Sequence, residues 1–459
     1  MLRPVRGPTP CPTARPGPSV PAMGDHPREP EVAPRRESPA ASSLLYLVGS
    51  LAGGSFVSMM LRMAGGVLQG RLVAPATLGL FTAIGLVLGY APFLQLGILN
   101  GLNRELPYYV GKGDRRHVQE LAAAAQAWAI AVGCAACTAL LCVAGWQLAH
   151  GELWQAAGWF TNAVLSICLF YNTYYLQMTY RTSHDFARLA SVGVVESALG
   201  LVLLVLVAQF NFYGLCLRAL SVGLVGTAIM FYWRPVRVSP KWNIHHLKHL
   251  LIIGAPIFGV GILYSWWGVM NSTLVLRFAG IEGMGLYSMV LMAGASLEFI
   301  PSAVSQVVYP RMAEGYGRSA SVGELIRIAR TPMMITAAVL LPVIAVAWLL
   351  VGPVVSFVVP AYIGAVPAIK WSLLLPIVSS LAPVNSVFNV VRRQDLYVVA
   401  VLLGMAAYGG SVMWLIRGQV KLEAFPQAML AGRAVFMLLC YVFVAHLRRG
   451  ERNRTVLAT

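Results

Sequence analysis

The chain has 459 residues, of which 58% are hydrophobic and 11% charged, and its mean hydropathy is +0.70. Soluble domains carry about a quarter charged residues, so these values exclude an ordinary soluble protein. The formal net charge of +17 would suggest nucleic-acid binding in a soluble chain. Here most of the cations lie in short connections between apolar stretches, where membrane orientation and anionic lipid explain them. We therefore expect no nucleic-acid partner.

Residues 1–42 are rich in proline and arginine and contain no apolar run. This composition predicts a disordered tail, because it cannot bury enough apolar surface to fold. No short apolar core with a cleavage site precedes Ser43, so the tail does not read as a secretory signal. Met23 is a second candidate start, and the sequence leaves that choice open.

Twelve apolar stretches follow, each long enough for one helical crossing of the bilayer, which takes about 20 residues. We therefore predict an all-α polytopic membrane protein with about 12 transmembrane helices. The first six spans are expected near Ser43–Leu68, Leu78–Leu102, Val118–Trp146, Leu153–Met178, Ala190–Gln209 and Phe212–Tyr232. The other six are expected near Leu250–Val275, Met284–Val308, Met333–Leu350, Ala368–Val391, Leu396–Ile416 and Phe425–His446.

The basic residues crowd the ends of these spans on one side. With the amino terminus inside, 26 arginines and lysines fall in the tails and inner connections. The outer connections hold only Arg71, Arg277, Lys370, Arg417 and Lys421. Cytoplasmic loops carry the excess of basic residues, so both termini are predicted in the cytoplasm.

The two halves of the chain share a short pattern. RLVAPATLGLF begins at Arg71 and RFAGIEGMGLY at Arg277, so that Gly79 and Gly285 stand at the same spacing from the arginines. An even number of spans per half keeps the orientation, which predicts two parallel six-helix lobes about a pseudo-twofold axis along the membrane normal. The expected organisation is a cytoplasmic tail (1–42), an N-lobe (43–232), a basic cytoplasmic linker (233–249), a C-lobe (250–446) and a cytoplasmic tail (447–459).

Three segments carry a family resemblance: RLVAPATLGLFTAIG from Arg71, NGLNRELPYYVGKGD from Asn100 and FVVPAYIGAVPAIKWSLLLP from Phe357. With them the chain, from about Ser43 to Arg449, resembles the polysaccharide and O-antigen flippases of the multidrug/oligosaccharidyl-lipid/polysaccharide exporter superfamily. The related lipid II flippases typically have two further spans, which are not found here.

This resemblance implies a multi-pass protein of the bacterial inner membrane. Its implied substrate is an undecaprenyl-diphosphate-linked oligosaccharide, moved outward for polysaccharide, O-antigen or lipopolysaccharide biosynthesis. Transport would proceed by alternating access through a cationic central cavity. The lipid bilayer, a glycan polymerase and a chain-length regulator are the further partners expected.

Five charged residues fall well within the spans: Arg62, Glu196, Arg218, Glu298 and Arg433. Each would cost about 3 kcal/mol or more if it faced lipid, so each is expected to face a cavity or a partner. Arg62 suits a diphosphate, because a guanidinium stays charged and offers forked donors; the alternative is a structural ion pair. Arg218 and Arg433 lie nearer outer span ends, where snorkelling to the interface is the simpler interpretation.

Other polar residues complete the candidate site. Arg71 and Arg277, at equivalent places in the repeat, either extend the substrate-binding surface outward or snorkel. Asn271 either binds glycan hydroxyls or bonds a neighbouring helix. Glu298 and Glu196 are candidates for binding a coupling proton or sodium ion, or for pairing with an arginine.

We expect no other cofactor, no metal site and no enzyme activity. His245, His246 and His249 lie in the basic linker with no nearby thiol or carboxylate in sequence, which favours a membrane-surface role over zinc binding. The chain shows no nucleophile–base arrangement, and its predicted outer connections are short. The alternative function is export of drugs or other small molecules by the same fold superfamily.

Overall fold

The computed structural model describes residues 41–183, 185–319, 321–391 and 393–458, with side chains between 53 and 451 apart from 260, 310 and 319. The predicted disordered tail, except for its last two residues, lies outside this range. The chain divides into two compact units, Met1–Leu45 and Tyr46–Thr459, and every contact given below lies within the second.

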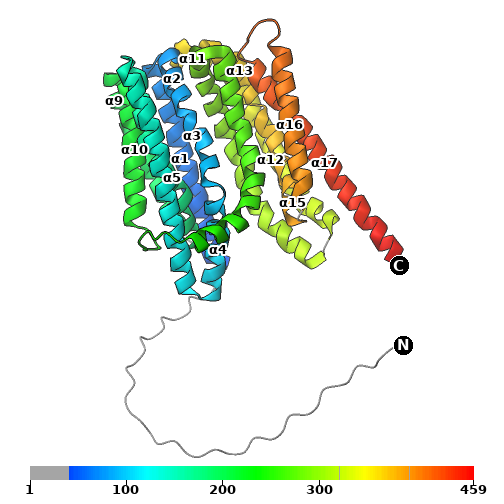
Figure 1. Cartoon of the computed structure of the whole chain (residues 1–459). Coiled ribbons are helices and arrows are strands. Elements are labelled where there is room, and N and C mark those ends of the chain that lie inside the picture. Colours follow the sequence, from blue (N-terminus) through cyan, green and yellow to red (C-terminus); the bar gives the residue numbers. More distant parts are fainter. Residues whose placement is uncertain (1–40, 184, 320, 392, 459) are drawn as a thin grey trace, which may run out of the picture. The chain divides into compact units, whose positions relative to one another are not determined.

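All regular structure among the described residues is helical, which confirms the predicted all-α fold (Figure 1). The elements of the N-lobe are α1 (Ala41–Leu72), α2 (Pro75–Gly85), α3 (Val87–Tyr90), η1 (Ala91–Gln95), α4 (Ile98–Lys112), α5 (Arg115–Ala149), α6 (Leu153–Cys168), η2 (Leu169–Leu176), α7 (Gln177–Thr182), α8 (Phe186–Val202), α9 (Leu204–Phe210) and α10 (Phe212–Tyr232). The elements of the C-lobe are α11 (Ile244–Ser319), α12 (Val322–Val358), η3 (Pro360–Ala365), α13 (Val366–Ser372), α14 (Leu375–Ser379), η4 (Ala382–Asn385), α15 (Ser386–Val390), α16 (Gln394–Leu415) and α17 (Ala424–Ala458).

Ten helical segments of the described residues are long and apolar enough to cross a membrane. One of them, Gly261–Arg318, has 58 residues and would span roughly 87 Å as a straight helix, against a hydrocarbon core of about 30 Å. It covers the eighth predicted span and the seventh from Gly261 onward, and the first residues of the seventh also lie in α11. Helix α1, which is not among the ten, coincides with the first predicted span. The ten segments are thus compatible with the twelve predicted crossings.

The second predicted span is broken. Pro92 lies in the 3₁₀ turn η1, and Leu96 and Gly97 follow with positive φ angles of 54° and 89°. Proline has no N–H to give to a helix, and glycine reaches the left-handed region without steric cost, so the helix ends and restarts at Ile98. The tenth predicted span is likewise divided into α13, α14, η4 and α15.

Helix α11 is kinked where the sequence predicts an outer turn between two spans. Gly280 has a φ of 72° and a ψ of −170°, outside the helical region. Beyond this kink α11 packs on α2 of the N-lobe, and Gly79 faces Gly285. A Cβ on Gly79 would overlap the carbonyl oxygen of Ile281, and a Cβ on Gly285 would overlap that of Pro75. The two helices meet backbone to backbone because neither glycine carries a side chain.

Before the kink α11 packs on α4 in the same manner. A Cβ on Gly101 would overlap the carbonyl oxygen of Leu250, and one on Gly254 would overlap that of Gly97. Between the two glycine contacts, the hydroxyls of Tyr90 and Thr273 share a hydrogen bond of 2.5 Å. Helix α11 therefore contacts the N-lobe on both sides of its kink.

Within the C-lobe, α17 runs beside α16 (Figure 1) and reaches back to the start of α12. The carboxylate of Glu451 accepts the backbone N–H of Val322 at 3.0 Å. The first N–H groups of a helix have no partner inside it, so an acidic side chain there stabilises the helix start. Large buried residues such as Phe388, Tyr408 and Phe436 form the core of this lobe.

Candidate functional site

Two cavities lie in the N-lobe and meet at a single pair of residues. The first cavity, of about 370 Å³, is lined by Arg62, Phe81, Glu196, Ser197, Gly200, Leu215, Arg218, Ala219, Val222 and Gly223. The second cavity, of about 170 Å³, is lined by Arg62, Asn172, Gln177, Leu189, Val192, Gly193, Glu196 and Met230. Along α10 the first cavity adjoins the first half of the helix and the second its last turn. Arg62 and Glu196 therefore stand where the two spaces join.

The guanidinium of Arg62 is only loosely held at this junction. Its Nε donates to the hydroxyl of Ser197 at 3.1 Å, while its Nη2 stays 3.9 Å from the carboxylate of Glu196. The Arg62 side chain is 65% exposed and that of Glu196 is 23% exposed. Room for the carboxylate comes from Gly226, since a Cβ there would overlap Glu196. An open guanidinium with a distant counter-charge can accept an anionic ligand without first breaking a tight bond.

Arg218 is the second cation of the first cavity, and its position differs from the expected snorkelling. Its Nε donates to the backbone oxygen of Gly200 at 2.6 Å, and its Nη1 bonds the amide oxygen of Gln69. The guanidinium lies beside Gly65 of α1, at ordinary contact distance (3.5 Å) from where a Cβ would stand. Because these partners are uncharged, Arg218 keeps its full charge inside the lobe.

The C-lobe holds its arginine in a different way. Arg433 of α17 lies 2.7 Å from the carboxylate of Glu298 on α11, and the hydroxyl of Ser379 on α14 bonds both, at 2.5 Å to Glu298 and 2.9 Å to Arg433. The side chains are about 21% and 31% exposed. Three elements thus meet in a charge-neutral triad. The expected snorkelling of Arg433 is absent, since its guanidinium turns inward to Glu298.

Asn271 lies in the interior of the C-lobe and lines neither N-lobe cavity. It is 2% exposed, its Oδ1 accepts from the hydroxyl of Tyr408 at 2.9 Å, and its amide also bonds the hydroxyl of Tyr287 at 3.1 Å. The amide joins two parts of α11 to α16, which matches the helix-bonding alternative raised for it from the sequence.

Arg71 and Arg277 have exposed side chains and line neither cavity. Arg71 ends α1, and Arg277 precedes the kink at Gly280. Of the six candidate residues, the structure therefore brings Arg62 and Glu196 together and leaves the others elsewhere.

The cavities also contain residues that the sequence did not single out. Ser197 was hidden in a small-residue run, and Asn172 in the aromatic segment LFYNTYYL. Ser379 of the C-lobe triad falls in the broken tenth span. The one available signal for Asn172 was an amide inside an otherwise apolar stretch, where buried amides need partners.

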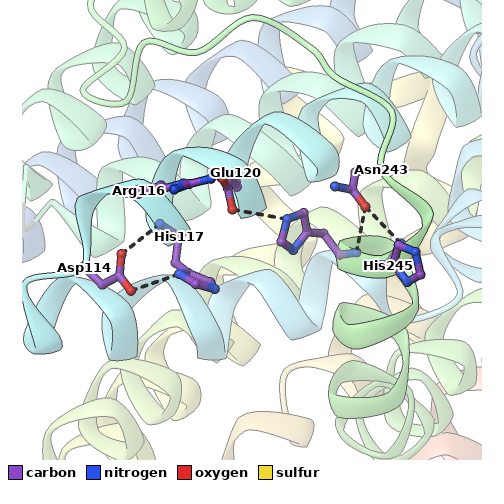
Figure 2. Close-up of polar contacts among 7 residues, drawn as sticks. Asp114, Arg116, His117, Glu120, Asn243 and His245 are labelled. Carbon is purple, nitrogen blue, oxygen red and sulfur yellow. Dashed lines mark hydrogen bonds and ion pairs between the residues drawn. The ribbon is translucent and has the colours of Figure 1, made fainter.

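A second polar region surrounds the starts of α5 and α11 (Figure 2). Asp114 caps α5, accepting the backbone N–H of His117 at 3.1 Å and lying 2.9 Å from its imidazole. That backbone hydrogen bond lowers the pKa of the Asp114 carboxyl below its usual value. Asn243 caps α11 in the same way, through the backbone N–H groups of His245 and His246.

Two histidine–carboxylate contacts join these elements across the lobes. His246 lies 3.4 Å from Glu120 of α5, and His249 lies 3.1 Å from Glu105 of α4. Each of these two imidazoles is turned toward an acidic residue of the N-lobe. The membrane-surface role expected of the linker histidines stays a prediction. No group of three or more His, Cys, Asp or Glu suited to a metal ion occurs in the described part of the chain.

A family model described as "polysaccharide biosynthesis protein" matches residues 68–361, well over half of the chain. The chain belongs to the polysaccharide biosynthesis protein family. The matched region includes every residue that lines the two N-lobe cavities apart from Arg62. It continues through α12 of the C-lobe. No curated protein sequence matches the chain.

Solved structures show the same fold at low sequence identity. An inward-facing multidrug resistance MATE family transporter of the MOP superfamily has a TM-score of 0.69 and 14% identity, with 86% of this chain and 96% of that chain covered. The outward-facing conformation of such a transporter has a TM-score of 0.63 and 14% identity, covering 89% and 96%. A MOP superfamily transporter from Pyrococcus furiosus, whose reverse polarity of binding pocket suggests a different function, has a TM-score of 0.63 and 15% identity, covering 88% and 95%. The chain is thus a multi-pass membrane protein with the two-lobed MOP transporter fold.

Proposed function

We propose that this family member moves a lipid-linked oligosaccharide from the cytoplasmic to the outer leaflet of a bacterial inner membrane. The observation that carries the proposal is the imbalance of charge between the lobes. The N-lobe cavities are lined by two arginines and one carboxylate. In the C-lobe, the charge of the intramembrane Arg433 is neutralised by Glu298. A cationic site in one lobe suits an anionic diphosphate.

Arg62 is the residue best placed to hold that diphosphate. Its guanidinium stands at the junction of the cavities, is largely exposed, and has its counter-charge at 3.9 Å. A phosphate oxygen would offer shorter, charge-assisted bonds than Glu196 does, so ligand binding would replace a weak ion pair with a stronger contact. Arg218 would add a fixed positive charge behind it, because its present partners are neutral.

Transport would follow from movement of the two lobes about the helices that join them. The lipid tail stays in the hydrocarbon, and only the diphosphate and glycan need the cavity. Outward movement of a negative group across an inside-negative membrane is favoured by about 2.3 kcal/mol per charge for each 100 mV. We infer that the Glu298–Arg433 pair takes part in resetting the empty carrier, with a proton or sodium ion as the candidate coupling ion.

Transport assays in reconstituted vesicles test this proposal. Vesicles would be loaded on the inner leaflet with fluorescent undecaprenyl-diphosphate-linked oligosaccharide, and its appearance on the outer leaflet followed by accessibility to a membrane-impermeant quencher. A lipophilic cationic dye in a parallel assay represents the alternative, a multidrug exporter. Movement of the lipid-linked glycan without movement of the dye supports the proposal. Movement of the dye alone would establish the alternative instead.

A further inference from the structure

The second cavity has the size of a small polar subsite. Its volume of about 170 Å³ exceeds several times the roughly 30 Å³ that one water takes up, yet lies below the roughly 300–1,000 Å³ of pockets for drug-sized ligands. Arg62 and Glu196 form its boundary with the first cavity, and Asn172 and Gln177 are its other polar residues. It therefore has room for one small polar group next to the proposed diphosphate position.

The helix segment that carries Asn172 is unusual. Residues Leu169–Leu176 form the π-helical element η2 between α6 and α7. Such turns are rare, and they occur frequently at functional sites because the wider turn redirects side chains. Asn172 is 8% exposed and lines the second cavity from this turn. The local backbone thus departs from the α-helix where a buried amide reaches the cavity.

The amide oxygen of Asn172, Oδ1, is buried and lacks a hydrogen-bond partner in the described part of the chain. The hydroxyl of Ser58 is in the same condition, 7% exposed and 3.4 Å from where a Cβ on Gly193 would lie. Buried polar groups are nearly always hydrogen-bonded, so an amide left unpaired beside a cavity indicates a ligand group that completes it.

We propose that the second cavity is a recognition subsite for the first sugar of the lipid-linked oligosaccharide, the ring attached directly to the diphosphate. This rests on the proposed function. An amide offers both a donor and an acceptor, which matches the hydroxyl or acetamido groups of a sugar. The carboxylate of Glu196, which lines both cavities, adds an acceptor. Because Arg62 borders both cavities, a diphosphate held there places its attached ring at the entrance of the second.

A bound cation fits this cavity less well. The guanidinium of Arg62 lines the same space and would repel it, and Glu196 is the one carboxylate among the lining residues. Sugar hydroxyls, by contrast, can bond a carboxylate, an amide and a guanidinium together.

Binding to the purified full-length protein in detergent tests the subsite, with two probes: undecaprenyl diphosphate, and the same lipid carrying a single N-acetylglucosamine. Asn172→Leu removes both hydrogen-bonding functions at similar volume. It should weaken binding of the sugar-bearing probe about tenfold, which corresponds to losing one buried hydrogen bond, and leave binding of the bare diphosphate unchanged. The matched control is Tyr175→Phe, which removes a buried hydroxyl of η2 that has no hydrogen-bond partner among the described residues and does not line the cavity. It should leave both affinities unchanged.

The outcomes separate the subsite from the proposed function. The subsite is overturned if Asn172→Leu binds both probes as tightly as the unaltered protein does. It is also overturned if the variant loses the same factor in affinity for both probes. Binding should also be measured with and without sodium. If binding to the unaltered protein depends on sodium, and Asn172→Leu loses that dependence but keeps its preference for the sugar-bearing probe, the cavity is a cation site and the sugar subsite is overturned. Arg62→Ala serves as the reference: it should weaken both probes, and if it weakens neither, the proposed diphosphate site itself fails. Retained binding of the bare diphosphate shows that Asn172→Leu and Tyr175→Phe are folded.

Discussion

Gly79 and Gly285 stand at the same register of the internal repeat and face each other where α2 crosses α11, the backbone nitrogen of each within 2.9 Å of the Cβ position of the other. Equivalent residues of a repeat meet only near the axis that relates its halves. The sequence pattern RLVAPATLGLF and RFAGIEGMGLY therefore marks the contact between the lobes.

This contact predicts an effect of side-chain volume. Gly79→Val or Gly285→Val would push β-branched side chains into the facing backbone, so each should abolish transport, and each should lower the melting temperature by separating the lobes. Gly409→Ala is the control, because a Cβ there meets nothing within 4 Å. It should transport normally and be neutral or slightly more stable. Normal transport by both valine variants would show that the lobes do not depend on this close approach.

The second prediction concerns orientation. A reporter that is active only in the cytoplasm should be active when fused after Gly113 or after Trp242, and inactive when fused near Ala149. The reason is the distribution of basic residues, which places the connection before α5 and the linker before α11 inside. A reporter of outside location should give the opposite result at each position. Reversed activities would place the termini outside.

The third prediction concerns the charge of Arg62. Arg62→Ala should reduce transport of the lipid-linked glycan at least tenfold without lowering protein abundance, because the exposed guanidinium contributes little to packing. Arg62→Lys should restore activity only in part, since a lysine cannot offer the bidentate fork. Arg71→Ala, an exposed arginine outside both cavities, is the matched control and should be active. An Arg62→Ala variant with full transport would exclude this residue from the mechanism.

The fourth prediction concerns the triad in the C-lobe. Glu298→Gln leaves Arg433 without its counter-charge, so it should slow turnover more than it weakens substrate binding. It should also lower the free energy of unfolding. Breaking a fully buried ion pair costs about 3–5 kcal/mol, and the partial exposure of this pair makes the expected loss smaller. The double variant Glu298→Gln/Arg433→Gln restores neutrality and should recover stability without recovering turnover. Recovery of both would make the pair purely structural.

The sequence predicted the helices well because long apolar runs and the asymmetry of basic residues depend on local composition alone. The repeat was also visible, since Gly79 and Gly285 keep their spacing from Arg71 and Arg277. The break after Pro92 was partly foreseeable as a proline bend, but the left-handed Leu96 was not, because leucine seldom adopts that conformation.

The candidate site was less predictable because it depends on which sides of the helices pack against each other. Arg62 and Glu196 are 134 positions apart in sequence and were singled out separately for their cost in lipid; nothing local indicated that they meet. Arg433 was read as snorkelling from its distance to the span end, whereas its direction is decided by Glu298 on another helix. The unpartnered amide of Asn172 likewise becomes visible only once its neighbours are placed.

The contact between Glu451 and Val322 bears on how this protein can be shortened or tagged. The basic stretch that ends α17 looks dispensable in sequence, and a purification tag would naturally be attached there. Ending the chain at Arg449 would remove the carboxylate that accepts the first amide of α12. Truncated versions that keep residues through Glu451 should purify as the full-length protein does, whereas shorter ones should lose yield through fraying at the start of α12.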